Sequence, residues 1–251
     1  MPFRQVGAAA PNPAVGFAKT IALNEGFGKR LGQLPKPNPG GPNPLVFEFE
    51  STIGLVVSNT ASGGRKVVVF DTGVPTQRRQ IWRALWQNGV RPYEVTHVVQ
   101  SHEHLDHTAN TGMFQNAISY AGASAFDART KEYTILVLNK DFPEQTVSID
   151  ENLKLRLTPG HTNTGYDRSM IVRNDEQYGT VALVGDLIQN ENDFMFDENS
   201  CDPSFQFCRN VESISASQRA IICEERADWV VPGHGKMFQV TAAVRQGFNC
   251  P

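Results

Sequence analysis

A short segment in the middle of the chain, Ser101 to Thr108, reads SHEHLDHT and concentrates groups that bind cations or protons. Three histidines and two carboxylates fall between His102 and His107, although the whole chain has only six histidines. The segment directly follows VTHVVQ, an apolar β-branched run that is typical of a buried strand. Polar residues at the end of a buried strand more often form a site than a merely solvated loop. The segment therefore predicts a sheet-based fold with a functional site at a strand end.

Three more ionisable residues lie at the ends of predicted strands further along the chain. His161 lies in LTPGHTNTG, Asp186 in ALVGDL and His234 in VVPGHG. If these strands share one edge of a sheet, their terminal turns converge and bring residues that are distant in sequence into one site. His97 is different, because it lies within the run VTHVVQ. We therefore interpret His97 as a core histidine.

The spacing of these residues suits two cations. In an extended chain His102 and His104 point to the same side, about 7 Å apart at the backbone, and can hold one ion. Asp106 and His107 are adjacent and point elsewhere, which suits a second ion. A carboxylate such as Asp186 can bridge two cations, one at each oxygen, as in two-metal hydrolytic sites. Imidazole and carboxylate are ligands for zinc, manganese or iron.

The organisation of the chain predicts an α/β fold. Residues 1–44 are rich in Pro, Gly and Asn and predict an irregular N-terminal arm, whereas residues 45–251 predict one compact domain. Helices are expected over residues 75–89 and 211–226. In the first of these, helical spacing predicts a core-facing apolar stripe around Ile81, Trp82, Leu85 and Trp86. Strands are expected at 44–59, 65–73, 95–100, 117–122, 133–139, 153–160, 168–174, 179–187 and 227–235.

Composition narrows the class of partner. The net charge is −3, with 23 basic and 26 acidic residues, so no broad basic face for nucleic acid or for an anionic membrane is expected. No apolar run is long enough to span a membrane and no secretory signal is visible, which predicts a cytoplasmic protein, with the nucleus as a further location. Free thiols are expected at Cys201, Cys208, Cys223 and Cys250, with a Cys201–Cys208 bridge as the alternative.

At this point the motifs resemble a known family. HEHLDH fits the H-x-H-x-D-H signature of the metallo-β-lactamase superfamily, and PGH, GD and PGHG follow in the family's order. The resemblance covers roughly residues 47–240. It implies an αββα sandwich that holds two divalent metal ions, with zinc favoured and iron or manganese as alternatives.

The resemblance also implies a role for each residue. The first metal would be bound by His102, His104 and His161, and the second by Asp106, His107 and His234, with Asp186 as the bridge. Asp106 would also be the catalytic residue that orients the attacking hydroxide and accepts its proton. Asp71 in VFDTG matches an aspartate that orients the metal-binding loop. Lys236 and Arg168 could contact an anionic substrate, although a solvated surface charge is the favoured interpretation of both.

Comparison within the family limits the substrate. The main antibiotic-hydrolysing subclass has a cysteine where this chain has Asp186, and only 25 residues separate His161 from Asp186, which leaves no room for the domain inserted in many RNA-cleaving members. Glyoxalase-II-like thioesterases share all seven ligands but usually add a C-terminal helical domain. The motifs also resemble those of a small animal member whose assigned activity is that of an endoribonuclease at the 3′ end of histone pre-mRNA.

Three classes of function therefore stay open at this stage. The resemblance implies an endoribonuclease with RNA as its partner. The alternatives are a thioesterase-like hydrolase, or another enzyme acting on a small molecule, and a non-hydrolytic member that binds iron. No membrane partner is expected, and a homodimer is one of the oligomeric states considered.

Overall fold

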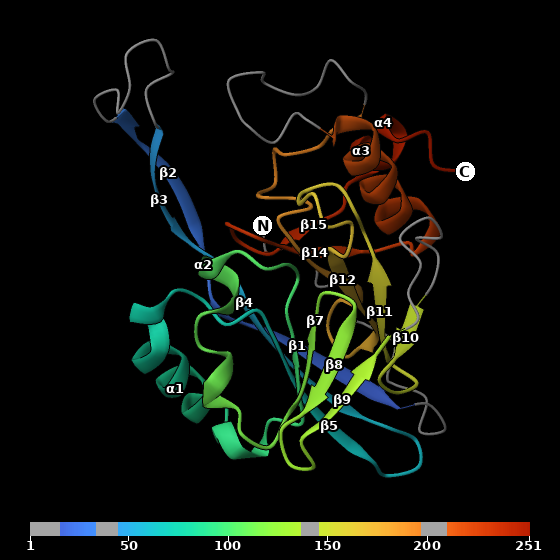
Figure 1. The fold of residues 1–251 in the computed structure, drawn as a ribbon. Coiled ribbons are helices and arrows are strands. Elements are labelled where there is room, and N and C mark those ends of the chain that lie inside the picture. Colours follow the sequence, from blue (N-terminus) through green and yellow to red (C-terminus); the bar gives the residue numbers. More distant parts are fainter. Residues whose placement is uncertain (1–15, 34–44, 137–145, 197–209) are drawn as a thin grey trace, which may run out of the picture.

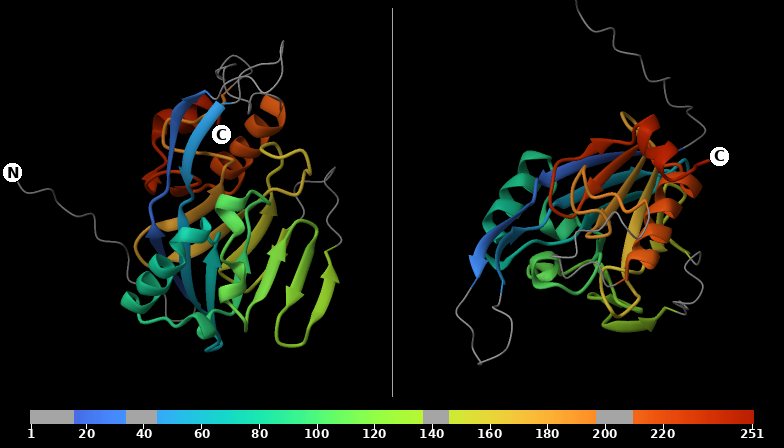
Figure 2. Two further views of the ribbon diagram at one scale, coloured as in Figure 1. Left: turned by 60° about the vertical axis from the view of Figure 1, so that its left-hand side comes forward. Right: turned by 90° about the horizontal axis from the view of Figure 1, so that it is seen from above.

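A computed structural model describes residues 16–33, 45–136, 146–196 and 210–251 (Figure 1). In it, the strands form one long hydrogen-bonded sheet of 13 strands and a separate two-stranded hairpin. The sheet has two halves, joined where β1 (Phe17–Asn24) pairs with β12 (Arg168–Asp175) at Ala18 and Asp175. Figure 2 shows the helices on the outside of the strands.

The N-terminal half of the sheet contains β1 and six later strands, in the order β1-β4-β5-β6-β7-β8-β9. The later six are β4 (Ile53–Asn59), β5 (Arg65–Phe70), β6 (His97–Val99), β7 (Ile118–Ala121), β8 (Ser124–Asp127) and β9 (Glu132–Ile135). β5, β6 and β7 run parallel, so the loops that follow β5 and β6 leave from the same edge. The metal-binding motif of the sequence begins directly after β6, at that edge.

The C-terminal half has the order β15-β14-β13-β12-β11-β10. Besides β12 it contains β10 (Thr146–Ser148), β11 (Leu153–Leu157), β13 (Gly179–Gly185), β14 (Trp229–Pro232) and β15 (Phe238–Gln239). β13 and β14 are parallel, so Asp186 and His234 follow neighbouring strands on the same side. The separate hairpin pairs β2 (Phe27–Gln33) with β3 (Leu45–Glu50).

The helices complete the description of the chain. They are α1 (Arg78–Gln87), α2 (Leu105–Thr108), α3 (Val211–Arg219) with its π-helical continuation η5 (Ala220–Glu224), α4 (Ala242–Gly247) and the 3-10 turns η1 (Pro75–Gln77), η2 (Pro92–Glu94) and η3 (Thr111–Met113). Among the described residues, no helix is long and apolar enough to cross a bilayer.

Three buried apolar clusters define four layers. The central cluster takes Val56, Phe70 and Val99 from one half of the sheet and Met170 and Leu183 from the other, so the two halves pack face to face. A second cluster packs α1 against the N-terminal half, and a third packs α3, η5 and α4 against the C-terminal half. Apolar burial of this extent is the main force that holds such layers together. The predicted αββα sandwich is confirmed.

Three expectations from the sequence differ from the structure. Within residues 1–44, predicted to be irregular, β1 and β2 are strands, because β1 lies between β4 and β12 and β2 pairs with β3. On α1 only Ile81 and Leu85 are buried, whereas Trp82 and Trp86 are 47% and 50% exposed. The other predicted strands and helices have counterparts, and residues 137–139 of one predicted strand lie outside the described residues.

The third difference concerns the cysteines. Cys223 and Cys250 form a disulfide, so the expected free thiols are wrong for this pair. The bond joins η5 to the segment after α4, within the third apolar cluster. Close packing of the two segments brings the cysteines to a Cα–Cα separation of 5.1 Å, which the 27 residues between them in sequence do not reveal. Cys201 and Cys208 lie outside the described residues.

His97 in β6 is a core residue, as its sequence position predicts. It is 5% exposed, its Nδ1 lies 2.8 Å from Thr96 Oγ1, and its ring stacks on Tyr120. Burial, together with the positive charge of Lys66, lowers its pKa to about 4 from 6.5. Below pH 6.5 the unfolded chain therefore takes up a proton at this position that the folded chain does not take up until about pH 4.

We expect this residue to contribute to acid sensitivity. The free energy of unfolding should fall as pH drops from 6.5 toward 4, by about 3 kcal/mol for the whole window at 1.36 kcal/mol per pKa unit. In the His97→Gln variant, which has no titrating group at this position, the free energy of unfolding should not show this part of the decrease. Denaturant unfolding of both proteins between pH 4 and 8, with chelator present, measures it. Equal pH dependence of the two proteins would show that His97 is not the source.

Candidate metal centre

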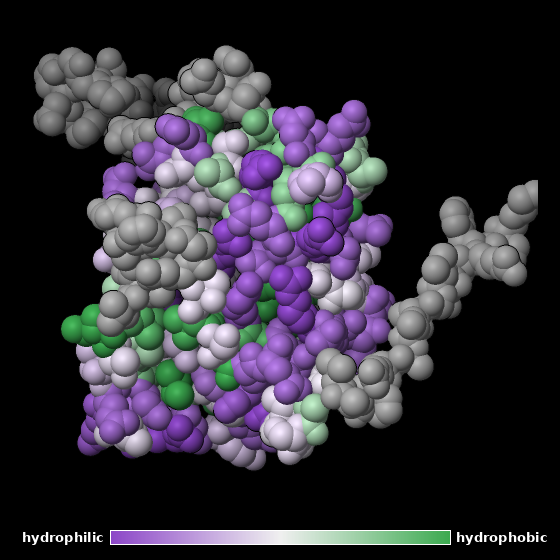
Figure 3. Space-filling model, turned by 90° about the vertical axis from the view of Figure 1, so that its right-hand side faces the viewer, coloured by the Kyte–Doolittle hydropathy of each residue, from purple (hydrophilic) through white to green (hydrophobic). Residues whose placement is uncertain are grey.

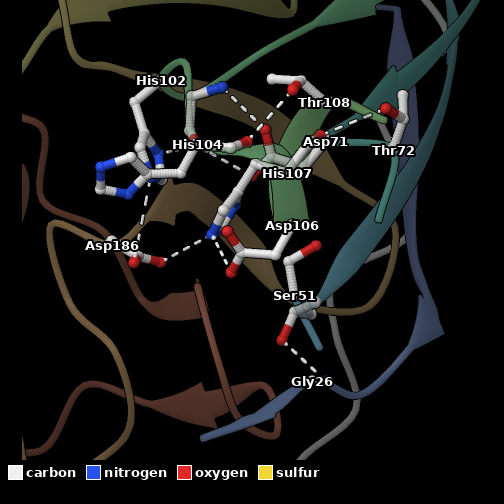
Figure 4. Close-up of polar contacts among 12 residues, drawn as sticks. Gly26, Ser51, Asp71, Thr72, His102, His104, Asp106, His107, Thr108 and Asp186 are labelled. Atoms are coloured by element: carbon white, nitrogen blue, oxygen red, sulfur yellow. Dashed lines mark hydrogen bonds and ion pairs between the residues drawn. The ribbon is translucent and has the colours of Figure 1, made fainter. Parts of the chain in front are cut away.

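The structure brings all seven predicted ligands together, at the edge where β6, β11, β13 and β14 end. Figure 4 labels His102, His104, Asp106, His107 and Asp186 among them. They form two groups, and within each group the potential ligand atoms lie within 4.8 Å of one another. The first group is His102, His104, His161 and Asp186, and the second is Asp106, His107 and His234. The two groups match the two sets that the sequence predicts, and the role of each residue as a ligand stays a prediction.

Asp186 faces both groups. Its Oδ2 lies 3.3 Å from His161 Nε2 and 4.0 Å from His102 Nε2, on the side of the first group. Its Oδ1 lies 3.0 Å from His107 Nε2 of the second group. His234 Nε2, also of the second group, lies 3.2 Å from Oδ1 and 3.3 Å from Oδ2. A single carboxylate therefore contacts imidazoles of both groups, as a bridge between two cations requires.

The remaining contacts complete each group. In the first, His104 Nδ1 lies 2.9 Å from His102 Nε2 and 3.2 Å from His161 Nε2. In the second, Asp106 Oδ2 lies 3.4 Å from His107 Nε2 and 3.5 Å from His234 Nε2. His104 and Asp106 differ from the other ligands in being nearer to solvent, since His104 is exposed and the Asp106 side chain is 20% exposed.

Two buried atoms support the assignment of this donor set to metal. His107 Nε2 and Asp186 Oδ1 are inaccessible to water and have no hydrogen-bond partner among the described residues, although they lie 3.0 Å apart. Buried polar atoms are rarely left without a partner, because desolvation costs free energy. Five imidazoles and two carboxylates converging around such atoms are the ligand chemistry of zinc and related divalent ions. The residues present therefore fit two cations.

Charges within the site set its protonation. Burial alone raises the pKa of Asp186, but the charges of His107 and His234 outweigh it and hold that pKa well below its usual range. Burial raises the pKa of Asp106 as well, but the neighbouring His107 imidazole reverses the shift and lowers that pKa. Both carboxylates are therefore anionic near neutral pH. Burial lowers the pKa of His102 and of His161, which favours the neutral imidazole that a metal requires.

Asp71 orients the motif from beneath, as its position in VFDTG predicts. Its Oδ2 lies 2.7 Å from His107 Nδ1 and accepts a bond from the Ser101 hydroxyl, and its Oδ1 accepts the Ser101 backbone N–H. The residue has φ +58°, a left-handed conformation that Asp tolerates better than most residues. The turn after β5 thus directs a buried carboxylate at the ligand loop. The carboxylates of Asp71 and Asp186 outweigh burial and hold the pKa of His107 well above its usual range.

Sequence reasoning missed several groups that support the ligands. Ser101 Oγ lies 2.9 Å from His102 Nδ1, and the Glu50 carbonyl lies 3.0 Å from His234 Nδ1. Thr72 N–H donates to the His107 carbonyl at 2.6 Å, which fixes the ligand loop to the turn after β5. Ser101 could have been found from its place directly before the motif. A main-chain carbonyl such as that of Glu50 carries no sequence signal.

Two glycines allow the strands to approach closely enough. Gly185 has φ +54°, and a Cβ there would overlap the Ser101 side chain. A Cβ at Gly233 would overlap the Asp186 carboxylate. The GD and PGHG motifs therefore need glycine at these positions, because no side chain fits between the ligand turns.

Of the two candidate substrate cations, Arg168 differs from the expected surface charge, whereas Lys236 agrees with it. Arg168 is 2% exposed, and its Nε and Nη2 have no hydrogen-bond partner among the described residues. Burial lowers its pKa to about 10. Arg168 is therefore neither a surface charge nor in a position to contact substrate, because β12 directs it into the interior of the sandwich. Lys236 is exposed, and its Nζ lies 3.8 Å from Glu25.

Comparison with known proteins agrees with this geometry. The sequence profile described as the metallo-beta-lactamase superfamily matches residues 47–234, so the chain belongs to that superfamily. It is 32% identical over 195 residues to metallo-beta-lactamase domain-containing protein 1 of Xenopus laevis, covering 78% of this chain and 75% of that protein. It is 30% identical over 196 residues to an uncharacterized Caenorhabditis elegans protein, covering 77% of this chain.

The chain spans 51% of the length of that C. elegans protein. Among solved structures, the fold is similar to that of a metallo-β-lactamase-type protein from Thermotoga maritima, with a TM-score of 0.58 and 18% identity over 89% of this chain and 100% of that one. A structural likeness at this identity concerns the fold alone. Family, fold and site together define a protein of the metallo-β-lactamase fold with a His/Asp cluster suited to divalent metal.

We expect close to two divalent ions per chain by elemental analysis. Asp186→Ala should lower this occupancy, because it removes the one side chain that faces both groups. His97→Ala is the matched control, since it removes a buried histidine from β6 outside the cluster and should leave the metal content unchanged. No more than one ion in the wild-type protein, or full occupancy in Asp186→Ala, would contradict the assignment.

Proposed function

We propose that this chain is a dinuclear metal-dependent endoribonuclease, with zinc as the favoured metal. The observation that carries the hydrolytic chemistry is Asp186, whose carboxylate contacts imidazoles of both groups. The choice of RNA rests on the resemblance of the motifs to an RNA-cleaving member of the superfamily. The identity of zinc is supported by ligand type, because imidazole and carboxylate form its usual hydrolytic sites.

The site supplies what phosphodiester hydrolysis needs. When bound, a pair of divalent cations lowers the pKa of water and polarises the oxygen of the bond to be cleaved. Asp106 is the carboxylate best placed to orient the attacking water and accept its proton, because it is anionic and its side chain is more exposed than that of Asp186. Water adds across the P–O bond, so one product ends in a phosphate and the other in a hydroxyl.

Asp71 and Ser101 act behind the ligands. They hold His107 and His102 by hydrogen bonds to Nδ1, which leaves each Nε2 directed into the site. Such supporting contacts fix the tautomer and the orientation of a ligating histidine. The rigid turn at Asp71 therefore keeps the ligands in place while substrates bind and leave.

The test is a substrate panel on metal-quantified protein, with single-stranded RNA, S-lactoylglutathione and a cephalosporin. We expect metal-dependent cleavage of the RNA, lost with chelator and restored by zinc. Asp106→Asn should lower kcat by at least about a hundredfold, because the proton acceptor is lost. RNA with a single 2′-deoxynucleotide at the cleaved position should still be cut, since the attacking oxygen comes from water.

Two outcomes would contradict this proposal. Efficient hydrolysis of S-lactoylglutathione without metal-dependent RNA cleavage would indicate a thioesterase. Iron as the bound metal with no hydrolysis of any substrate in the panel would indicate a non-hydrolytic member of the family.

A further inference from the structure

The outer face of α1 carries exposed aromatic and basic side chains that the metal centre does not use. Ile81 and Leu85 fill the core side of the helix, while Trp82 and Trp86 remain 47% and 50% exposed. The two indoles are four residues apart and stack, with ring centroids 5.4 Å apart and planes inclined by 21°. Large apolar side chains gathered on a surface generally mark an interaction site.

Arginines extend this aromatic row at both ends. The guanidinium of Arg91 lies over the Trp86 ring, 3.2 Å from its centroid. At the other end, Arg78 precedes Trp82 by one helical turn, and Arg79 adjoins it. Arg78, Arg79 and Trp82 line an open pocket of about 470 Å³ together with Thr76, Pro92 and Met113. The face is therefore a row of planar groups beside a basic pocket.

The charge of this segment is opposite in sign to that of the chain. Residues 75–93 contain four arginines and no Asp or Glu, in a protein of net charge −3. Two acids that contact this segment are engaged locally, since Glu94 accepts the Arg91 backbone N–H and Glu50 accepts a bond from Gln77. Figure 3 shows the side of the molecule away from α1, which is mainly hydrophilic. A local positive potential with apolar rings favours an anionic ligand that has flat faces.

The same face is joined to the metal centre. The turn after β5 leads into α1, and the ligand loop leads into η3, which supplies Met113 to the pocket. Hydrogen bonds tie the two segments together, from the Asn110 side chain to the Val74 carbonyl and from Ala109 N–H to the Gly73 carbonyl. In Figure 1, α2 and α1 lie on the same side of the molecule. A long substrate that reaches the metal centre can therefore extend over α1.

We propose that the α1 face, defined as Arg78, Arg79, Trp82, Trp86 and Arg91, binds a single-stranded segment of RNA next to the bond that is cleaved. This inference rests on the proposed ribonuclease function and adds to it a second binding surface. Unpaired bases stack on exposed indoles, and guanidinium groups contact the phosphates between them. A duplex would not offer its base faces to these rings, so the surface selects single strands.

Other occupants fit the face less well. A second copy of the chain placed symmetrically on it would bring the three arginines of the face in both copies together, at a cost from like charges. An acidic peptide would satisfy the arginines but would use the stacked indoles less fully than a row of bases. Both occupants are separate outcomes of the test below.

The decisive measurement is binding of a 20-nucleotide oligouridylate to the metal-loaded protein. Two of the three tryptophans lie in the α1 face, so stacking of bases should quench the intrinsic fluorescence. Trp82→Ala and Trp86→Ala should each weaken binding by roughly tenfold. Arg78→Gln combined with Arg79→Gln should reduce the slope of log K against log salt by about 1.4, because each phosphate contact on a single strand contributes about 0.7.

Matched controls separate this face from general surface effects. Tyr133→Ala removes an aromatic ring that is 67% exposed on β9, and Arg65→Gln removes an exposed arginine at the start of β5, both outside the α1 face. Both controls should bind RNA like the wild type. Hydrolysis of bis(p-nitrophenyl) phosphate, too small to span from the metal centre to α1, should be unchanged in all of these variants. For RNA cleavage, the tryptophan variants should raise KM and leave kcat near the wild-type value.

The outcomes distinguish this inference from the function on which it rests. If the tryptophan and arginine variants bind RNA as tightly as the wild-type protein does, the α1 inference is overturned and the ribonuclease proposal still stands. RNA binding that depends on the α1 face, without cleavage, would support the inference and overturn the ribonuclease. Quenching by an acidic peptide but not by RNA, or self-association that is lost in Trp82→Ala, would overturn the inference in favour of that other occupant.

Discussion

The contact of the Asp186 carboxylate with two sets of imidazoles is the constraint on which the rest of the site depends. An anionic carboxylate at such depth is costly to desolvate and persists only with positive or hydrogen-bonding groups around it. Here His107, His161 and His234 surround it from three different loops. The position of Asp186 therefore determines how closely the ends of the strands must approach one another. Glycine at positions 185 and 233 makes that approach possible.

The sandwich supplies the rigidity that this contact needs. Each ligand turn follows a strand whose side chains lie in a buried apolar cluster, so the turn starts from a fixed position. The layers are close-packed, and a displacement of one ligand would have to move a whole strand. The turn at Asp71 adds a second restraint, since its carboxylate and the Thr72 N–H hold the ligand loop by side chain and main chain together.

Much of the site was visible in the sequence because its residues follow strands. A strand with an apolar run followed by PGH, GD or PGHG places its polar residue at a predictable end of a sheet, so the convergence of the turns follows from this rule. The division of the residues into two groups of ligands came from the family resemblance. The exposure of the two indoles on α1 was less predictable. Helical spacing groups Trp82 and Trp86 with Ile81 and Leu85, but it does not show how wide a face the sheet can cover, and the two indoles lie beyond that width.

Other features depend on contacts between distant segments. β1 lies in a stretch rich in Pro and Gly, and only the partners β4 and β12 on either side make it a strand. The Cys223–Cys250 bond depends on how α4 folds back onto η5. Burial of Arg168 was equally hidden, because a charged residue at the start of a strand is ordinarily exposed. In all three cases tertiary packing overrides what composition suggests.

The ligands are divided between the two halves of the sheet. His102, His104, Asp106 and His107 follow β6 in the N-terminal half, whereas His161, Asp186 and His234 follow strands of the C-terminal half. Each predicted group of ligands takes members from both halves, so a cation bound to either group would fasten one half to the other. The affinity for the ions and the free energy of unfolding are then thermodynamically linked, so a change in one changes the other. A substitution that loosens the packing between the halves would weaken metal retention without touching a ligand, and scarcity of metal would shorten the lifetime of the folded chain.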